Sequence, residues 1–118
     1  MPTITTATLA QRSGSNITLT VEIAWNSPLE LALGYMMRVE FYEEDRRSDD
    51  YLMAIDIPIS ASPTRPNPQT IVRDVRIGPR LDTEITDEEV YAIVVLNPAT
   101  PAGSLTATRR TPTISVDY

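Results

Sequence analysis

Apolar and polar residues alternate along much of the chain, as they do in β-strands that bury one face and expose the other. The clearest alternation covers 16–25, where every second residue from Ile17 to Trp25 is apolar. A second stretch covers 34–43, where the odd-numbered positions from Tyr35 onward are apolar. Each stretch predicts one strand with a buried face and a wetter face.

The remaining strands have shorter or weaker patterns. Residues 51–59 alternate again, although Pro58 confines the end of this strand to a sheet edge or a bulge. Residues 90–96 are almost wholly apolar, as expected for a central strand that is buried on both sides. Further strands are predicted at 4–9, at 70–77, and in a last strand, interrupted at Pro112, that comprises 105–109 and 114–118.

Seven short strands separated by turn residues predict an all-β fold, a single antiparallel seven-stranded sandwich over residues 1–118. Thr, Ile and Val make up 34 of the 118 residues, and β-branched side chains favour strands. Ten prolines leave little room for a helix of ordinary length. A small closed barrel is the competing fold.

The register of the predicted strands places several individual side chains. Trp25 continues the apolar face of its strand, so we expect it in the core between the sheets. Asp56 is expected to point outward from an edge strand. Met36 and Tyr42 share the outer face of one strand and are candidates for an exposed apolar contact. The alternation over 114–118 predicts that the end of the chain is paired into a sheet.

The composition excludes several kinds of chemistry. The chain has no cysteine, histidine or lysine, which removes disulfides, zinc sites, Schiff-base lysines and nucleophiles activated by histidine. Sixteen acidic against ten basic residues give a net charge of −6, which argues against nucleic acid as a partner. No apolar run of about 18 residues is present to span a membrane, and the first residues do not resemble a secretory signal. We therefore expect a protein that is cytoplasmic or associated with a virion or another particle.

No combination of residues predicts catalysis or a cofactor. Carboxylate, serine and tyrosine side chains remain, but they form no recognisable set of nucleophile, base and orienting group, so no enzyme activity is expected. Calcium is the one metal whose oxygen ligands the side chains supply, yet the acidic loop at 43–50 lacks the glycine of an EF-hand. Calcium binding is therefore considered but not favoured.

Successive antiparallel strands send their loops to alternate ends of a sandwich. The loops at 10–16, 43–50 and 78–89 are expected to share one end, and those at 26–34, 60–69 and 97–104 the other. The first, here called the acidic end, holds ten carboxylates: Glu43, Glu44, Asp45, Asp49, Asp50, Asp82, Glu84, Asp87, Glu88 and Glu89. The second, here called the proline end, has only Glu30 and Arg65 as charged residues. Because proline lowers the entropy lost when a loop is ordered, the prolines of this end are interaction candidates: Pro28, Pro63, Pro66, Pro68, Pro98 and Pro101.

A family resemblance covers roughly a third of the chain. An alternating strand that ends in Trp25 is followed by Pro28 and by a strand that carries Tyr35, Val39 and Tyr42. This stretch resembles the second and third strands of immunoglobulin-like domains, fibronectin type III domains in particular. The segment 91–94, followed by Gly103, is similar to the sixth strand of that fold and the turn after it. The resemblance implies a tryptophan between the sheets and a role in adhesion, scaffolding or recognition.

The favoured function is a non-enzymatic structural or protein-interaction module of a larger assembly, such as a phage virion or a contractile-tail accessory protein. A protein partner or self-assembly is expected in that case. The alternative is a β-sandwich module that binds carbohydrate or calcium through exposed aromatic residues or the acidic loops. A hydrolase would require a buried pair of carboxylates in a cleft, and no motif indicates one.

Overall fold

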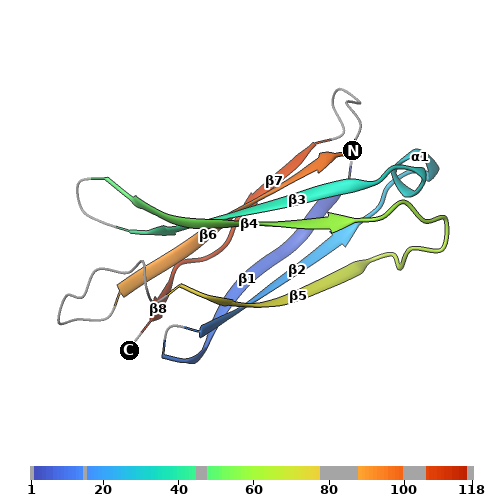
Figure 1. Cartoon of the computed structure of the whole chain (residues 1–118). Helices are drawn as coiled ribbons and strands as arrows, with labels where there is room; N and C mark the ends of the chain where they lie inside the picture. The colour runs from blue at the N-terminus through green and yellow to red at the C-terminus, as the bar shows by residue number, and fades with distance from the viewer. Residues whose placement is uncertain (1, 15, 45–47, 78–87, 100–105, 117–118) are drawn as a thin grey trace.

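The computed structural model describes residues 2–14, 16–44, 48–77, 88–99 and 106–116. Two antiparallel sheets face each other (Figure 1). The three-stranded sheet has the order β1-β2-β5 and comprises β1 (Thr3–Ser13), β2 (Asn16–Ala24) and β5 (Gln69–Arg76). The five-stranded sheet has the order β4-β3-β6-β7, with β8 also paired to β6, and comprises β3 (Tyr35–Glu43), β4 (Asp50–Ile59), β6 (Glu88–Pro98), β7 (Ala107–Arg110) and β8 (Ile114–Val116). The prediction of an all-β, sandwich-like fold is confirmed.

The side chains that face the space between the sheets form the core. In β2 the odd-numbered residues from Ile17 to Ile23 have no solvent exposure, and in β3 those from Tyr35 to Phe41 are at most 1% exposed. Each such aliphatic side chain contributes about 1.5–3 kcal/mol relative to an exposed one, so these two strands supply much of the stability. Trp25 is 4% exposed and belongs to the same core, as its register predicted.

β6 is the central strand of the five-stranded sheet, but it is not buried on both faces. Val90, Ala92, Val94 and Leu96 have no solvent exposure, because they point toward the other sheet. On the outer face Tyr91 is buried, whereas Ile93 and Val95 are only half-buried. The expectation of burial on both sides therefore holds at Tyr91 but not at Ile93 and Val95, whose outer face no further layer of described residues covers.

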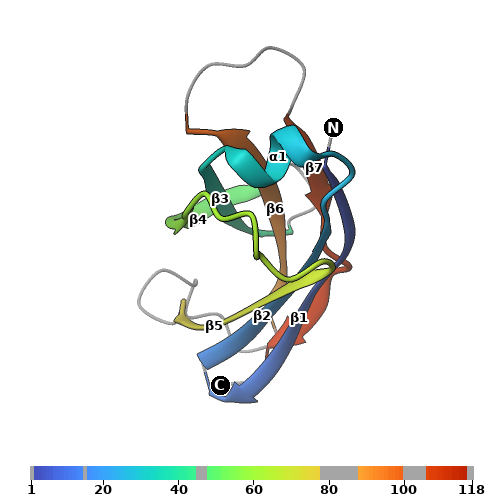
Figure 2. The same ribbon diagram turned by 90° about the vertical axis from the view of Figure 1, so that its right-hand side faces the viewer.

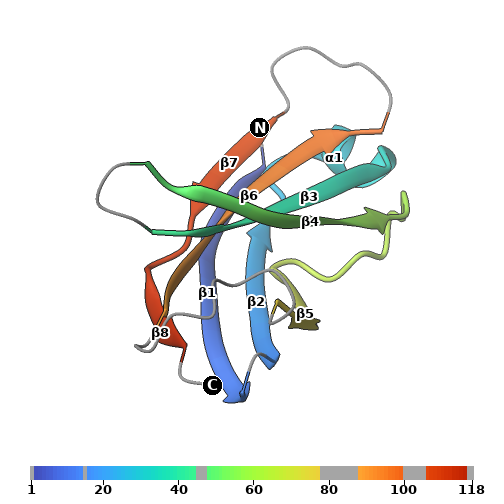
Figure 3. The ribbon, with the colours of Figure 1, turned by 60° about the vertical axis from the view of Figure 1, so that its left-hand side comes forward.

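The described strands number eight rather than seven, because the last predicted strand is divided into β7 and β8. Figure 3 shows both lying along β6. Between them Thr111 remains bound to Ala92, since the backbone N–H of Thr111 donates to the Ala92 carbonyl (2.8 Å) and the Thr111 hydroxyl accepts from the Ala92 N–H (2.9 Å). The pairing of the C-terminal segment is confirmed through Val116, whereas Tyr118 lies outside the described residues.

A short helix, α1 (Pro28–Ala32), occupies the segment that the sequence predicted as a loop. Ser27 is its N-cap and Pro28 stands in its first turn, where the missing N–H of proline removes no helical hydrogen bond. The described part of the chain contains no helix that is long and apolar enough to cross a membrane.

The two long sides of the sandwich differ. On one side β1 contacts β7 and β8, and the guanidinium of Arg109 donates to the carbonyl of Ile4 (3.2 Å), which joins the sheets. On the other side β4 and β5 are the outermost strands and make almost no contact with each other, as Figure 2 shows in a view from the end. The sandwich is thus closed along β1 and open between β4 and β5.

Candidate functional site

The described parts of the three loops of the proline end meet in the structure, as the alternation of loops predicted; the third loop is described only to Ala99. The backbone N–H of Ser62 donates to the carbonyl of Leu31 (3.0 Å), which ties the 60–68 loop to α1. The N–H of Ala99 donates to the carbonyl of Gly34 (2.7 Å), which ties the end of β6 to the start of β3. Figure 1 shows α1 and the 60–68 loop at the same end of the sandwich.

Glu30 is one of the two charged residues predicted for this end, and it is completely buried. Its Oε1 accepts from the backbone N–H of Asn26 (2.8 Å), and its Oε2 accepts from the hydroxyl of Ser27 (3.1 Å). Burial alone would raise the pKa of Glu30, but hydrogen bonds, including those from Asn26 and Ser27, outweigh it and lower the pKa. The carboxylate thus holds the turn that leads into α1.

Arg65 is the other charged residue of this end, and it is only 7% exposed. Its Nη1 donates to the carbonyl of Glu30 (2.9 Å), and its Nη2 donates to the carbonyls of Leu33 (2.8 Å) and Ser60 (2.7 Å). Its guanidinium carbon lies 4.2 Å from the centre of the Trp25 ring. Burial lowers the pKa of Arg65, yet an arginine stays charged in a protein. A single cation therefore joins α1, the end of β4 and the core.

Two polar atoms beside Trp25 are buried and have no hydrogen-bond partner among the described residues: the hydroxyl of Tyr35 and the Nε of Arg65. The rings of Trp25 and Tyr35 are tilted against each other, with centroids 5.0 Å apart. Burial and the charge of Glu30 raise the pKa of Tyr35, and Arg65 partly opposes this. This buried cluster of Trp25, Tyr35 and Arg65 therefore contains one hydroxyl and one N–H group that make no hydrogen bond to the described residues.

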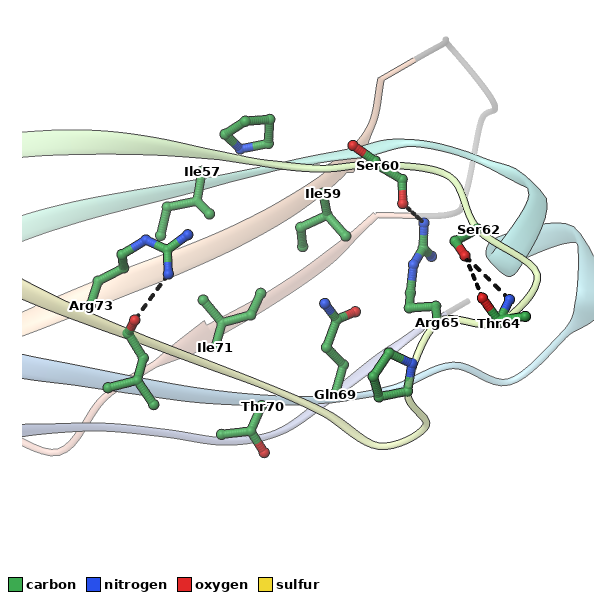
Figure 4. Close-up of a pocket in the computed structure, with 13 residues that line it drawn as sticks. Ile57, Ile59, Ser60, Ser62, Thr64, Arg65, Gln69, Thr70, Ile71 and Arg73 are labelled. Carbon is green, nitrogen blue, oxygen red and sulfur yellow. Dashed lines mark hydrogen bonds between the residues drawn. The ribbon is translucent and has the colours of Figure 1, made fainter.

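A groove with a volume of about 550 Å³ lies along the open side of the sandwich, between the end of β4 and the start of β5. Figure 4 shows Ile57 and Ile59 pointing into it from β4 and Ile71 pointing into it from β5. Arg65 lies at one end of this row of isoleucines and Arg73 at the other. The described residues that line the groove include no Asp or Glu, so the groove combines isoleucines with uncharged polar side chains and has an arginine at each end.

Both strands that border the groove have an unpaired edge. Within the described residues β4 pairs only with β3, and β5 pairs only with β2. The N–H and C=O groups on the outer edge of such a strand can accept another strand. The isoleucines that point into the groove and the unpaired backbone edges on its two borders together form a surface that fits an extended polypeptide.

A second surface feature is a row of aromatic side chains across the outer face of the five-stranded sheet. Tyr42 is half-buried, stacks on Tyr91 with ring centroids 5.4 Å apart, and meets the edge of Tyr51 at 5.8 Å. The guanidinium carbon of Arg110 lies 3.7 Å from the centre of the Tyr91 ring. The Tyr91 hydroxyl donates to Oδ2 of Asp49 (2.5 Å), and burial together with this hydrogen bond raises the pKa of Tyr91 to about 12. Tyr51 is the most accessible ring of the row, at 53% exposed.

The interaction candidates of the sequence fall into separate groups. Met36 is 39% exposed and shares the outer face of β3 with Tyr42, but Arg38 and Glu40 lie between them, so the two form no joint patch. Asp56 points outward and lies 3.5 Å from Arg38, as predicted. The prolines lie as follows: Pro63, Pro66 and Pro68 are exposed in the 60–68 loop, Pro66 lines the groove, Pro28 is exposed on α1, Pro98 is half-buried at the end of β6, and Pro101 lies outside the described residues.

The acidic end is described only in part, since Asp45, Asp82, Glu84 and Asp87 lie outside the described residues. The N–H of Glu44 donates to the carbonyl of Glu89 (2.8 Å), so the described ends of two of its segments meet where β3 and β6 pair. Glu43 and Glu88 are buried, at 6% and 9% exposed, and do not add to a solvated acidic surface. Among the described residues no group of three or more acidic side chains could hold a metal ion.

Sequence reasoning placed Glu30 and Arg65 at the proline end but assigned them no role, and it did not single out Arg73. Glu30 had a readable signal, because Ser27 followed three positions later by a glutamate is the pattern of a capping box. Arg65 and Arg73 had none: one is a lone charge in a proline-rich loop, and the other interrupts an apolar strand face. The carbonyls of Glu30 and Leu33, which Arg65 binds, and strand β4, which borders the groove opposite Arg73, are distant from these arginines in sequence.

Comparisons with protein-family models, with curated proteins and with solved structures find no match to this chain. The groove and the aromatic row therefore have to be interpreted from their own chemistry.

Proposed function

We propose that this chain is a non-enzymatic recognition or structural module of a larger assembly, which binds another polypeptide along its open side. The observation that carries the proposal is the groove between β4 and β5, with isoleucines at its floor and an unpaired strand edge on each border. A virion or a contractile tail is an assembly of the kind we expect. The membership of the immunoglobulin-like superfamily belongs to the same proposal, and Trp25 packed against Tyr35 supports it.

The proline end supports the proposal because hydrogen bonds hold the loop at this end of the groove in place. Arg65 donates to three carbonyls from two segments, so the end of the groove is fixed before a partner arrives. A surface that is already ordered loses little conformational entropy on binding. Such a groove can bind with the modest contact area that one strand provides.

Site-specific photo-crosslinking tests the proposed function in the native assembly. The photoreactive residue p-benzoylphenylalanine replaces Val72, which lines the groove and is 51% exposed. The matched control carries it in place of Thr108, an exposed residue of β7 on the other sheet. We expect one discrete protein adduct from position 72 and none from position 108. Equal labelling from both positions, or none from either, would contradict the proposal.

A second candidate function is carbohydrate binding by the aromatic row, favoured by the exposed ring of Tyr51 beside the stacked pair Tyr42 and Tyr91. Tyrosine rings on a flat sheet face offer apolar surface and a hydroxyl at once. A glycan array distinguishes this function: retention of a glycan that is lost in Tyr51→Ala but kept in Val72→Ala would favour it over polypeptide binding.

A further inference from the structure

The two strand edges that border the groove are not equivalent as acceptors of another strand. β4 contains Pro58, which lines the groove and has no backbone N–H to donate. Prolines of this kind deter strand addition at a sheet edge. β5 contains no proline between Gln69 and Arg76, and its sheet has only three strands. An incoming strand is therefore favoured beside β5.

A strand beside β5 would place its side chains in two different environments, because successive side chains point to opposite faces. Those on the inner face would cover Ile57, Ile59 and Ile71 at the floor of the groove. Those on the outer face would lie next to Val72, which is 51% exposed. The fit therefore selects an extended segment with apolar residues at alternate positions.

The charges of the groove indicate what else the segment carries. Arg73 is exposed and donates to the carbonyl of its neighbour Val72 (3.0 Å). In the described part of the chain the ion pairs involve Arg12, Arg38 and Arg110, so neither Arg65 nor Arg73 has a carboxylate within 4.0 Å. Because the chain as a whole has a net charge of −6, an acidic ligand is repelled by most of the surface and attracted to this groove.

On these grounds we infer that the groove binds an extended acidic segment of a partner protein, which adds to β5 as a fourth strand and places a carboxylate beside Arg73. The inference rests on the proposed function and specifies its ligand. Arg65 is a positioning residue in this arrangement: it fixes the loop that forms one end of the groove and adds a positive charge there.

Synthetic peptides with the full 15N-labelled chain test the inference by NMR titration. The probe is a peptide of roughly nine residues that alternates threonine and valine, with one central valine replaced by glutamate. Matched peptides carry glutamine or lysine instead. We expect amide shifts concentrated in 69–76, and binding of the glutamate peptide about threefold tighter than that of the glutamine peptide. The lysine peptide should bind most weakly.

The contribution of Arg73 is separated from general electrostatics by a matched pair of variants. Arg73→Gln should abolish the preference for the glutamate peptide and leave the affinity for the glutamine peptide unchanged. Arg76→Gln removes the same charge from the same strand outside the groove and should preserve the preference. A preference that survives in Arg73→Gln, or that is lost equally in both variants, overturns the role of Arg73.

Strand addition itself is tested by methylating the backbone nitrogens of the glutamate peptide. Only one edge of an added strand pairs with β5, so methylation of one alternate set of nitrogens should abolish binding and methylation of the other should be tolerated. Equal binding of both methylated peptides, or no binding of the glutamate peptide, overturns the inference. A specific crosslink from position 72 in that case would leave the proposed function standing, because it requires only that a polypeptide occupies the groove.

Discussion

At the scale of single residues, Arg65 shows how a charge can be buried for a structural purpose. Its guanidinium replaces water as the donor to the carbonyls of Glu30, Leu33 and Ser60, and it stacks on Trp25. The planar fork of arginine suits several acceptors at once, whereas the ammonium of lysine is a compact point charge. The proline end depends on this one side chain more than on its prolines.

The first prediction concerns the replacement of Arg65. Arg65→Ala should lower the free energy of unfolding by about 2–4 kcal/mol, because three carbonyls lose a charged donor and the ring of Trp25 loses its cover. Arg65→Lys should recover only part of this loss. Urea denaturation measures both, with the exposed Arg73→Ala as the control for charge. A loss below about 0.5 kcal/mol in Arg65→Ala would show that the side chain is not required.

The second prediction concerns the pH dependence of stability. The pKa of Tyr91 is raised to about 12 in the folded protein, first by burial and then by its hydrogen bond to Asp49. Since an ordinary tyrosine ionises near pH 10, this phenol contributes stability that is fully present below about pH 10. That stability, on the order of 2 kcal/mol, is lost as the pH rises through the folded pKa.

Denaturation midpoints measured between about pH 9 and pH 12 check this expectation. The wild-type midpoint should fall across this range, and Tyr91→Phe should fall less steeply because it has no phenol to ionise. Tyr51→Phe, in which the altered ring is largely exposed, is the matched control and should follow the wild type. Identical slopes for all three proteins would refute the burial of Tyr91.

At the scale of elements, the alternation of residues predicted the strands wherever one face is buried along the whole length. β2 and β3 fulfil that condition, and their registers place Trp25 and Tyr42 as expected. The five residues of α1 are too few to show a helical period of apolar residues. Only the N-cap at Ser27 could therefore have predicted this helix. The division into β7 and β8 falls at the interruption predicted at Pro112, and the contact between Thr111 and Ala92 keeps the segment bound to β6 across it.

The candidate site was less predictable than the strands. Sequence reasoning brought the right loops together at the proline end, and of its candidate prolines Pro66 is the one that lines the groove among the described residues. The groove exists because β4 and β5 end two different sheets on the same side, and that arrangement depends on how the sheets pack. The alternation of apolar and polar residues in one strand carries no information about the position of the other sheet. Arg73 could therefore not be recognised as part of a site.

The third prediction concerns β8. Val116 has no solvent exposure, and β8 pairs with β6 through the register Glu88↔Val116 to Val90↔Ile114. Deletion of residues 114–118 should lower the free energy of unfolding by at least about 2 kcal/mol, because a buried valine and the edge of β6 become exposed. Thermal unfolding followed by circular dichroism measures this. The surface change Ser115→Ala should have little effect. An unchanged melting temperature after the deletion would disprove the role of β8.

At the scale of the whole molecule, excess negative charge opposes folding only modestly, because part of it is paired. Arg12 lies 2.6 Å from Asp74, and Arg110 lies 4.0 Å from Glu44, which also accepts a hydrogen bond from Thr113 (2.9 Å). These pairs are exposed and each is worth less than about 1 kcal/mol. The pairs thus offset only part of the mutual repulsion that the net charge of −6 produces.

The fourth prediction follows from this repulsion. Sodium chloride should raise the melting temperature modestly, because at physiological ionic strength charges are screened over about 8 Å. Calcium chloride at equal ionic strength should add little, since a calcium site needs six to eight oxygens converging on one point. Differential scanning fluorimetry compares the two salts directly. A rise in melting temperature that is specific to calcium at sub-millimolar concentration would instead support the calcium-binding alternative.

The open side between β4 and β5 is the central claim, and amide hydrogen exchange of the isolated chain tests it most directly. In an edge strand every second N–H points away from the neighbouring strand and is free to exchange, whereas an inner strand has all its N–H groups paired. We predict alternating fast and slow amides along Gln69–Arg76 in β5, and uniformly slow amides along β2 and the centre of β3. Uniform protection along β5 would contradict the account, because it would mean that the edge is already covered and the groove is not free to bind a partner.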